Sequence, residues 1–416
     1  MRAAPRLPAY ALFAAMISAA GLPLYMHAPK FFVDQYGVSL AALGSVLFGL
    51  RLLDVVQDPL LGRLADRARQ YRGMSVLIAG IGMAAGMYGL FAVSPLMAPL
   101  WWFGITLTLV FSSFSYLTIC FYAQGVAAAA DIPDGGGHLK VARWRETGAL
   151  LGICAAAVAP VALGGYTGFA LAFLVLSAVA LWAMRTEWKG VETPGAGIGA
   201  VLQDSIARRL LLVALANSAP VAVSSTLFLF FVEDRLDLPG WEGPFLLMFF
   251  LSAAIAAPVW GRLAEGYGTR RVLVIGMVLS IVAFAFAIFL GPGDAIAFGL
   301  ICVASGIALG ADMTLLPALF AARMQQVSPA AAEGFSLWSF VSKITLAFAA
   351  VALLPLLEAG GYRSGQDNTE AGLLLLSLLY GAVPCLLKLI AIAVLVSTRT
   401  DKITSQPTPL QERSAT

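Results

Sequence analysis

Apolar runs of roughly 20 residues recur along the chain, separated by short polar or glycine- and proline-containing segments. A helix of about 20 residues crosses a hydrocarbon core of about 30 Å. The runs are nearly continuous in hydrophobicity, unlike the alternating segments of about ten residues in membrane β-barrels. The pattern therefore predicts an all-α membrane protein with twelve transmembrane helices. The predicted spans are 8–30, 40–62, 74–94, 98–128, 142–164, 166–185, 208–232, 243–264, 271–291, 294–322, 335–357 and 372–397.

Composition supports this prediction and divides the chain. Of the 416 residues, 60% are hydrophobic and 12% are charged, whereas about 25% are charged in ordinary soluble domains. One sizeable polar stretch lies between the sixth and seventh predicted spans. We therefore expect an N-terminal six-helix half (1–185), a cytoplasmic linker (186–207), a C-terminal six-helix half (208–397) and a cytoplasmic tail (398–416).

The basic residues indicate how the chain is oriented. Most of the 26 Lys and Arg residues fall on the side of the predicted bundle that carries both termini. Because such residues concentrate in cytoplasmic loops, we predict a multi-pass monomer in the cytoplasmic (inner) membrane, with both termini in the cytoplasm. The net charge of +3 follows from this orientation and gives no sign of nucleic-acid binding. The cysteines fall inside spans and are predicted to be packing residues: Cys120, Cys154, Cys302 and Cys385.

The two halves repeat one another at a fixed offset of 199 residues. Residues 32–34 match 231–233, and 62–66 match 261–265, so the chain has two halves related by duplication. Two such halves around a central site form the transporter architecture called the major facilitator fold. The segments GRLADR and GRLAEGYGTRR resemble the loop signature of that superfamily. They supply the residues that we expect to act in the scaffold and in gating: Gly62, Asp66, Arg67, Gly261 and Glu265.

The second predicted span carries three charged residues, Arg51, Asp54 and Asp58, whose spacing places them on one helix face. Their counterparts at the offset are Phe250, Ala253 and Ala257, so folding alone does not require the charges. Each charge at a helix centre costs about 2.5 to 3.5 kcal/mol. The two carboxylates are therefore predicted to face a cavity and to bind Na⁺ or H⁺, and the arginine is predicted to pair with an unoccupied carboxylate. A static network between helices is the alternative.

Residues 51–59 fit the pattern R-x-x-D-x-x-x-D-P and resemble the glycoside-pentoside-hexuronide:cation symporters, the melibiose permease family. The resemblance implies that Asp54 and Asp58 bind the coupling cation, with no other cofactor. The stretch EGFSLWSFVSKITLA, residues 333–347, resembles a second motif of that family and implies that Lys343 lies near the central site. Its depth in the span makes Lys343 a candidate partner for either aspartate, or a donor to substrate oxygens.

A third similar stretch, VARWRETGALLGI, implies that Arg145 contributes to a sugar site, although its place at a cytoplasmic helix start could also explain an arginine. Ser18 and Cys120 stand where the family has aspartates. We keep Ser18 as a candidate substrate contact. The loss of both carboxylates puts sugar specificity in doubt, as well as the choice between Na⁺ and H⁺.

Other polar residues lie deep in predicted spans. Asp312 lies in the middle of its span and is expected to bind substrate or a proton. Gln124 is a candidate hydrogen-bond donor to a polar solute, with packing between helices as the alternative. Lys388 is expected to extend along its helix to the cytoplasmic interface.

These features predict a secondary transporter that couples Na⁺ or H⁺ to the symport of a small polar solute, with a sugar or glycoside implied by the resemblance. Two alternatives stay open: an exporter or lipid-like solute transporter of the same fold, and a transport-inactive membrane sensor. We predict no enzyme, because the chain offers no nucleophile and base pair, metal set or phosphate loop at a membrane face.

Overall fold

The structure is a computed structural model that describes residues 4–132, 136–188, 196–362 and 368–398. Its long elements are all helices, which confirms the predicted fold class. They are α1 (Leu7–Ala19), α2 (Leu22–Tyr36), α3 (Leu40–Arg67), α4 (Arg72–Phe91), α5 (Pro99–Ala130), α6 (Gly137–Ala162), α7 (Tyr166–Met184), α8 (Gly197–Gln203), α9 (Ser205–Phe230), α10 (Glu242–Tyr267), α11 (Thr269–Ala285), α12 (Ala295–Val327), α13 (Ala332–Ala359) and α14 (Glu370–Ser397). Short helical turns follow α3, α9 and α11: η1 (Arg69–Tyr71), η2 (Phe231–Arg235) and η3 (Phe286–Phe289).

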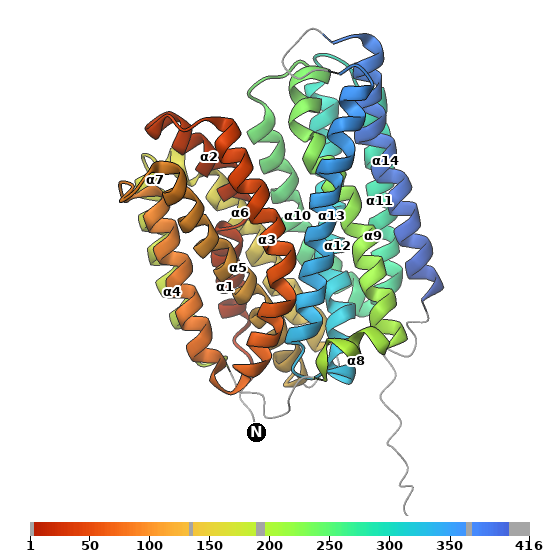
Figure 1. Ribbon diagram of the computed structural model, residues 1–416. Coiled ribbons are helices and arrows are strands. Elements are labelled where there is room, and N and C mark those ends of the chain that lie inside the picture. Colours follow the sequence, from red (N-terminus) through yellow and green to blue (C-terminus); the bar gives the residue numbers. More distant parts are fainter. Residues whose placement is uncertain (1–3, 133–135, 189–195, 363–367, 399–416) are drawn as a thin grey trace, which may run out of the picture.

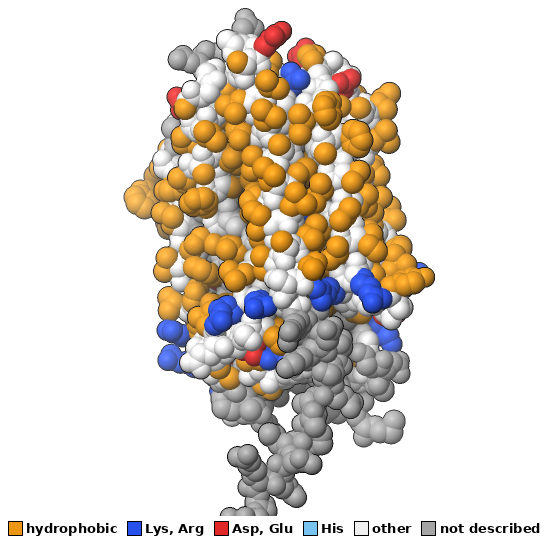
Figure 2. Space-filling model, turned by 90° about the vertical axis from the view of Figure 1, so that its right-hand side faces the viewer, with side chains coloured by type: hydrophobic (Ala, Val, Ile, Leu, Met, Phe, Trp, Pro, Cys, Tyr) orange, Lys and Arg blue, Asp and Glu red, His pale blue; other side chains and the backbone are white. Residues whose placement is uncertain are grey.

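Ten of the described helices are long and apolar enough to cross a membrane. The 28-residue α3 is also long enough but carries the charged residues of the second predicted span. Together with the pair α1 and α2, it completes twelve crossings. The molecule presents a broad hydrophobic belt, with Lys and Arg gathered along one rim (Figure 2). We call this rim, where α3 and α10 finish, the basic end.

The first predicted span, 8–30, is not one continuous helix. α1 ends at Ala19 and α2 begins at Leu22, so the chain breaks at Gly21. Pro23 follows in the first turn of α2, where its missing N–H needs no helical partner. The Gly21 amide donates to the carbonyl oxygen of Ser18 at 3.0 Å and closes the turn. The prediction of a single helix was wrong because an apolar run does not record such a break.

The helices form two groups that lie side by side, α1–α7 on the left and α9–α14 on the right of Figure 1. Between the groups, α3 packs against α13 and α6 packs against α10. At the 199-residue offset α3 corresponds to α10 and α6 to α13, so the two contacts are equivalents of one another. The interface between the halves is thus built twice from the same pair of repeated elements.

Candidate functional site

A buried ion cluster joins the two halves where α3 packs against α13. The Lys343 ammonium of α13 lies 3.0 Å from Asp58 Oδ1 and 3.5 Å from Asp54 Oδ1, both on α3. It also donates to Ser115 Oγ of α5 at 2.6 Å. The aspartates and Lys343, which the sequence analysis associated, therefore meet in one cluster that spans both halves.

Burial makes this cluster sensitive to any change in charge. Asp58 is fully buried, Asp54 is 4% exposed, and the Lys343 side chain is 14% exposed. Asp58 Oδ2 has no hydrogen-bond partner among the described residues. Arg51 belongs to α3, but its side chain lies outside the described residues. In the described part of the chain, the two carboxylates thus share the Lys343 ammonium, and Asp58 Oδ2 is available for a further ligand.

A hydrogen-bond chain extends the cluster toward α5. Ser112 Oγ donates to Gln57 Oε1 at 2.9 Å, and Gln57 Nε2 donates to Asp54 Oδ1 at 2.8 Å. The sequence analysis did not single out Gln57, Ser112 or Ser115. Gln57 lies three residues after Asp54, which places both side chains on neighbouring parts of one helix face. The two serines, from a distant segment, gave no comparable signal.

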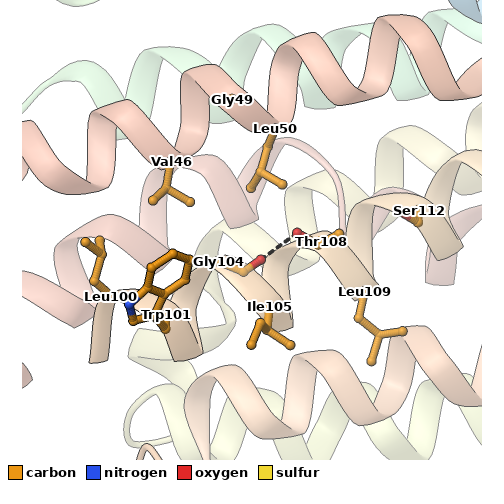
Figure 3. Close-up of a pocket in the computed structure, with 10 residues that line it drawn as sticks. All are labelled: Val46, Gly49, Leu50, Leu100, Trp101, Gly104, Ile105, Thr108, Leu109 and Ser112. Carbon is orange, nitrogen blue, oxygen red and sulfur yellow. Dashed lines mark hydrogen bonds between the residues drawn. The ribbon is translucent and has the colours of Figure 1, made fainter. Parts of the chain in front are cut away.

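A cavity of about 630 Å³ lies between α3 and α5 and ends at this chain. Its lining residues are Val46, Gly49, Leu50, Leu100, Trp101, Gly104, Ile105, Thr108, Leu109 and Ser112 (Figure 3). Most of the wall is apolar, and the Thr108 hydroxyl is bound to the carbonyl oxygen of Gly104 at 2.6 Å. Trp101 is 71% exposed and Ile105 is 52% exposed on the outer surface of the bundle. The cavity therefore lies between the apolar outer surface of the bundle and Ser112, where the hydrogen-bond chain to Asp54 begins.

Arg145 forms a separate buried group within the N-terminal half. Its Nε donates to Glu146 Oε1 at 2.6 Å, and Tyr122 OH donates to the same oxygen at 2.9 Å. The Arg145 guanidinium also lies over the Tyr122 ring, 3.7 Å from the centroid. Gln124 is buried, and its Oε1 has no partner among the described residues. Ser18 is half-buried in the last turn of α1.

Asp312 is buried within the C-terminal half, where it pairs with Lys388 of α14. The Lys388 ammonium also donates to Asn217 Oδ1 of α9 at 2.7 Å. Lys388 is 2% exposed, so the expectation that it reaches the cytoplasmic interface is wrong. A carboxylate at matching depth on α12 holds the ammonium inside the bundle. The signal was present as two deep opposite charges, which the sequence analysis treated separately.

The predicted gating residues lie at the basic end. A Cβ at Gly62 would overlap the side chain of Ser336, and a Cβ at Gly261 would lie 3.2 Å from Arg143 Cδ. Both contacts cross between the halves. The remaining gating candidates lie on α3 and α10: Glu265, 3.7 Å from Arg143; Asp66, 4.0 Å from Arg69; and Arg67, which is exposed. Close helix approach therefore accounts for Gly62, whereas the Arg143 side chain opposite Gly261 is flexible.

Metal-ligating side chains do not form a larger centre in the described part of the chain, where no group of three or more His, Cys, Asp or Glu residues is placed to hold a metal ion. The two carboxylates and the Ser115 hydroxyl at the ion cluster are oxygen ligands, which suit hard cations. The chemistry available at the interface is therefore the binding of a proton or of a small cation in competition with Lys343.

Comparison with known families decides the class of protein. The family described as MFS/sugar transport protein matches residues 8–402, nearly the whole chain. The chain belongs to this family. As a member of the MFS/sugar transport family, it is a multi-pass membrane transporter of the major facilitator superfamily and not an enzyme. Its setting is accordingly a lipid bilayer and its substrate a small molecule.

Solved structures of other transporters have a fold similar to that of this member of the MFS/sugar transport family. A bacterial homologue of the iron transporter ferroportin, in an outward-facing state, has a TM-score of 0.70 at 15% identity over 97% of this chain and 100% of its own. The human organic anion transporter MFSD10 (TETRAN) has a TM-score of 0.63 at 15% identity over 94% of this chain and 98% of its own. No curated protein matches the sequence. At these identities the structures establish the fold alone.

Proposed function

We propose that this transporter couples a monovalent cation, Na⁺ or H⁺, to the symport of a small polar solute by alternating access. A sugar or glycoside is the solute class implied by the resemblance to the melibiose permease family. The observation that carries the proposal is the Lys343 ammonium held between Asp54 and Asp58 across the two halves. Arg145, Ser18 and Gln124 are proposed as solute contacts on the sequence argument alone.

The proposed coupling is a competition for the carboxylates. Lys343 belongs to the C-terminal half and the aspartates belong to the N-terminal half, so their ion pairs tie α13 to α3. A cation or proton that binds the aspartates weakens this tie and frees the ammonium. Solute and cation then bias one conformational equilibrium, and each raises the affinity for the other.

We further propose that the protein is a monomer in the cytoplasmic membrane and that the basic end faces the cytoplasm, in keeping with the positive-inside rule. Contacts between the halves gather at that end, including Gly62 with Ser336 and Arg143 with Glu265. This arrangement corresponds to a state that is closed toward the cytoplasm. The direction of net flux is tested separately, by comparing right-side-out with inverted vesicles.

The cation site is tested by thermal unfolding of the purified protein during Na⁺ and Li⁺ titrations at two pH values, with choline at matched ionic strength. Binding to the folded state alone stabilises by about 2.7 kcal/mol at a hundred times the dissociation constant. We expect stabilisation of the wild type that is lost in Asp58→Asn. The matched control is Asp237→Asn, which changes an exposed carboxylate.

The two candidate coupling ions, an alkali cation and a proton, give different outcomes in this test. A response to Na⁺ or Li⁺ that depends on Asp58 identifies an alkali-cation site, and a response to pH alone identifies proton coupling. Equal behaviour of wild type and Asp58→Asn under every condition would reduce the carboxylates to a structural role and reject the symport proposal.

A second candidate function is the transport of an amphiphilic, lipid-like solute, and the cavity between α3 and α5 favours it. The cavity is apolar along most of its length, opens beside the exposed Trp101 and ends at Ser112, where the polar chain begins. Such a shape matches a molecule with one hydrocarbon chain and a polar head group. The same cation site would then serve a different cargo.

Filling the cavity separates the two candidates. A Cβ at Gly104 would meet only Val46, at 3.6 Å, so Gly104→Leu projects into the cavity without a clash of its Cβ. For an amphiphile transporter we expect binding of fluorescent lysophosphatidylcholine to weaken by about tenfold, or about 1.4 kcal/mol. The control Gly243→Leu changes a glycine with open space around it. Unchanged binding in Gly104→Leu would exclude this cavity as the lipid site.

A further inference from the structure

Three polar side chains meet inside the C-terminal half and bind one another. Asp312 of α12, Lys388 of α14 and Asn217 of α9 are at least nine-tenths buried. The Lys388 ammonium binds Asp312 Oδ2 and donates to Asn217 Oδ1 at 2.7 Å. All three helices belong to one half, so a movement of one half against the other leaves these contacts intact. The cluster therefore differs in kind from the pair at Lys343.

The carboxylate of this cluster is only half satisfied. Asp312 Oδ1 is buried and has no hydrogen-bond partner among the described residues. A cavity of about 20 Å³ lies beside the cluster, and its lining residues include Asp312, Lys388, Ser224, Ser280 and Ser305. That volume accommodates one water molecule, and the site offers the polar partners that a water requires. Asp312 thus has one oxygen without a hydrogen-bond partner in the described part of the chain, and the cavity beside the cluster has room for a water molecule that would deliver a proton.

Each of the three helices also has a proline near the cluster: Pro220 on α9, Pro317 on α12 and Pro384 on α14. A proline lacks the N–H that would bind the carbonyl four residues earlier. The released carbonyls belong to Ala216, Met313 and Tyr380, and the first two adjoin Asn217 and Asp312 directly in the chain. A carbonyl without a helical partner remains a hydrogen-bond acceptor, and two such groups belong to residues next to the cluster in the chain.

Among the residues that the structure describes around this site, the charged group that faces Asp312 is Lys388. The other elements around the site offer uncharged side chains: Asn217 and Ser224 from α9, Phe249 from α10 and Ser280 from α11. We propose that Asp312 is a proton-binding site of its own, separate from Asp54 and Asp58. The proton adds to Asp312 Oδ1, and Lys388 stays charged on the amide oxygen of Asn217. The cluster then changes from neutral to a single positive charge.

This proposal is independent of the cation site at the interface, because it needs neither a solute nor the aspartates of α3. The test is infrared difference spectroscopy of the purified protein in lipid during a pH titration. We expect a carboxyl C=O band that grows as the pH falls and that shifts with aspartate-specific ¹³C labelling. The band is expected to disappear in Asp312→Asn/Lys388→Gln, which removes both charges together, and to persist in Asp58→Asn.

A conservative variant covers the case in which the double variant does not fold. Asp312→Glu keeps a carboxyl group, and its pH-dependent band is expected to lose sensitivity to the aspartate label. A band of full intensity in Asp312→Asn/Lys388→Gln, or an unchanged label shift in Asp312→Glu, would overturn the proposal. The proposal would also be overturned if Na⁺, but not choline, removed the Asp312 band. Asp312 would then bind an alkali cation and not a proton.

Discussion

Lys343 serves two carboxylates at once, and this sharing sets the energetics of the interface at the scale of single residues. Its ammonium is nearer to Asp58 than to Asp54, at 3.0 against 3.5 Å, and the more deeply buried carboxylate thus receives the shorter contact. A buried ion pair adds little net stability over apolar packing, but the loss of one partner leaves an uncompensated charge.

We predict from this that Lys343→Gln destabilises the protein by about 3 to 5 kcal/mol, because Asp58 is left buried without its counter-charge. Lys343→Gln/Asp58→Asn is expected to recover most of the loss. The measurement is a double-mutant cycle of thermal unfolding in detergent, with Arg271→Gln as a control at an exposed arginine. If the loss in Lys343→Gln/Asp58→Asn equals the sum of the losses in Lys343→Gln and in Asp58→Asn, the pair is not coupled.

The residue scale also shows what the sequence can and cannot predict. Asp54 and Asp58 could be placed on one face because helical spacing alone decides it, and their depth required a deep partner such as Lys343. Lys388 was misplaced because a long side chain can reach an interface from several turns away, and only packing decides whether it does. The neighbour of Arg145 in the chain, Glu146, proved to be its ion partner, which spacing did not indicate.

At the scale of elements, the contact between α3 and α13 depends on a residue without a side chain. A Cβ at Gly62 would overlap Ser336, which is fully buried and has no room to move away. Elsewhere in α3, Gly44 has nothing within 4 Å of the same position. The two glycines of one helix therefore offer a matched pair of substitutions.

Gly62→Ala is predicted to separate α3 from α13 at the basic end, at a cost of about 1 to 3 kcal/mol to the observed arrangement. Gly44→Ala is expected to have little effect. The distance between spin labels at Gln70 and Pro329, one in each half at the basic end, reports the change by double electron–electron resonance. A distance distribution that stays the same in Gly62→Ala would show that the contact does not control the interface.

The linker is held to the C-terminal half by Asp204, which caps α9 and binds α12. It accepts hydrogen bonds from the Ala207 amide at 2.7 Å and from Arg323 Nε at 3.0 Å. Burial alone would raise the pKa of the Asp204 carboxyl, but the bonds from Arg323 and Ala207 outweigh it and hold the pKa below its usual value. The charged carboxylate thus stabilises the fold above the unfolded-state pKa, and this contribution is lost as the pH falls through the folded-state value.

Asp204→Asn is accordingly predicted to lower the stability by about 1 kcal/mol at neutral pH, since the side chain is partly exposed and asparagine is still a good helix cap. The difference from the wild type is expected to vanish in acid below the folded-state pKa. Thermal unfolding at both pH values measures it, with Asp237→Asn as the control. A difference that persists undiminished in acid would assign it to packing and not to charge.

At the scale of the whole molecule, the hydrophobic belt and the basic end define an orientation (Figure 2). We predict that a cysteine at Asp237 reacts with an impermeant maleimide in intact cells, whereas a cysteine at Gln70 reacts only after permeabilisation. Both positions are exposed. The background carries alanine at Cys120, Cys154, Cys302 and Cys385. The opposite labelling pattern would reverse the proposed topology.

The fold as a whole was predictable because length, hydropathy and the internal repeat act over the entire chain. The equivalence of 62–66 and 261–265 was enough to anticipate two matching halves, and the structure shows how they meet. The cavity between α3 and α5 could not be foreseen, since its volume depends on how side chains such as Val46 and Trp101 pack after folding. The break near Gly21 was likewise hidden in a continuous apolar run.

The Lys343 ammonium is attached to the protein through its own side chain, and this attachment has a consequence for the proposed binding of a cation at Asp54 and Asp58. A tethered group has an effective concentration of about the millimolar range or more, whatever the composition of the medium. A free cation is diluted away when the salt is low, whereas the ammonium never leaves. The cation concentration at half-saturation would therefore include the free energy needed to displace Lys343 from the carboxylates. One side chain would then set the range of salt concentration in which a cation binds.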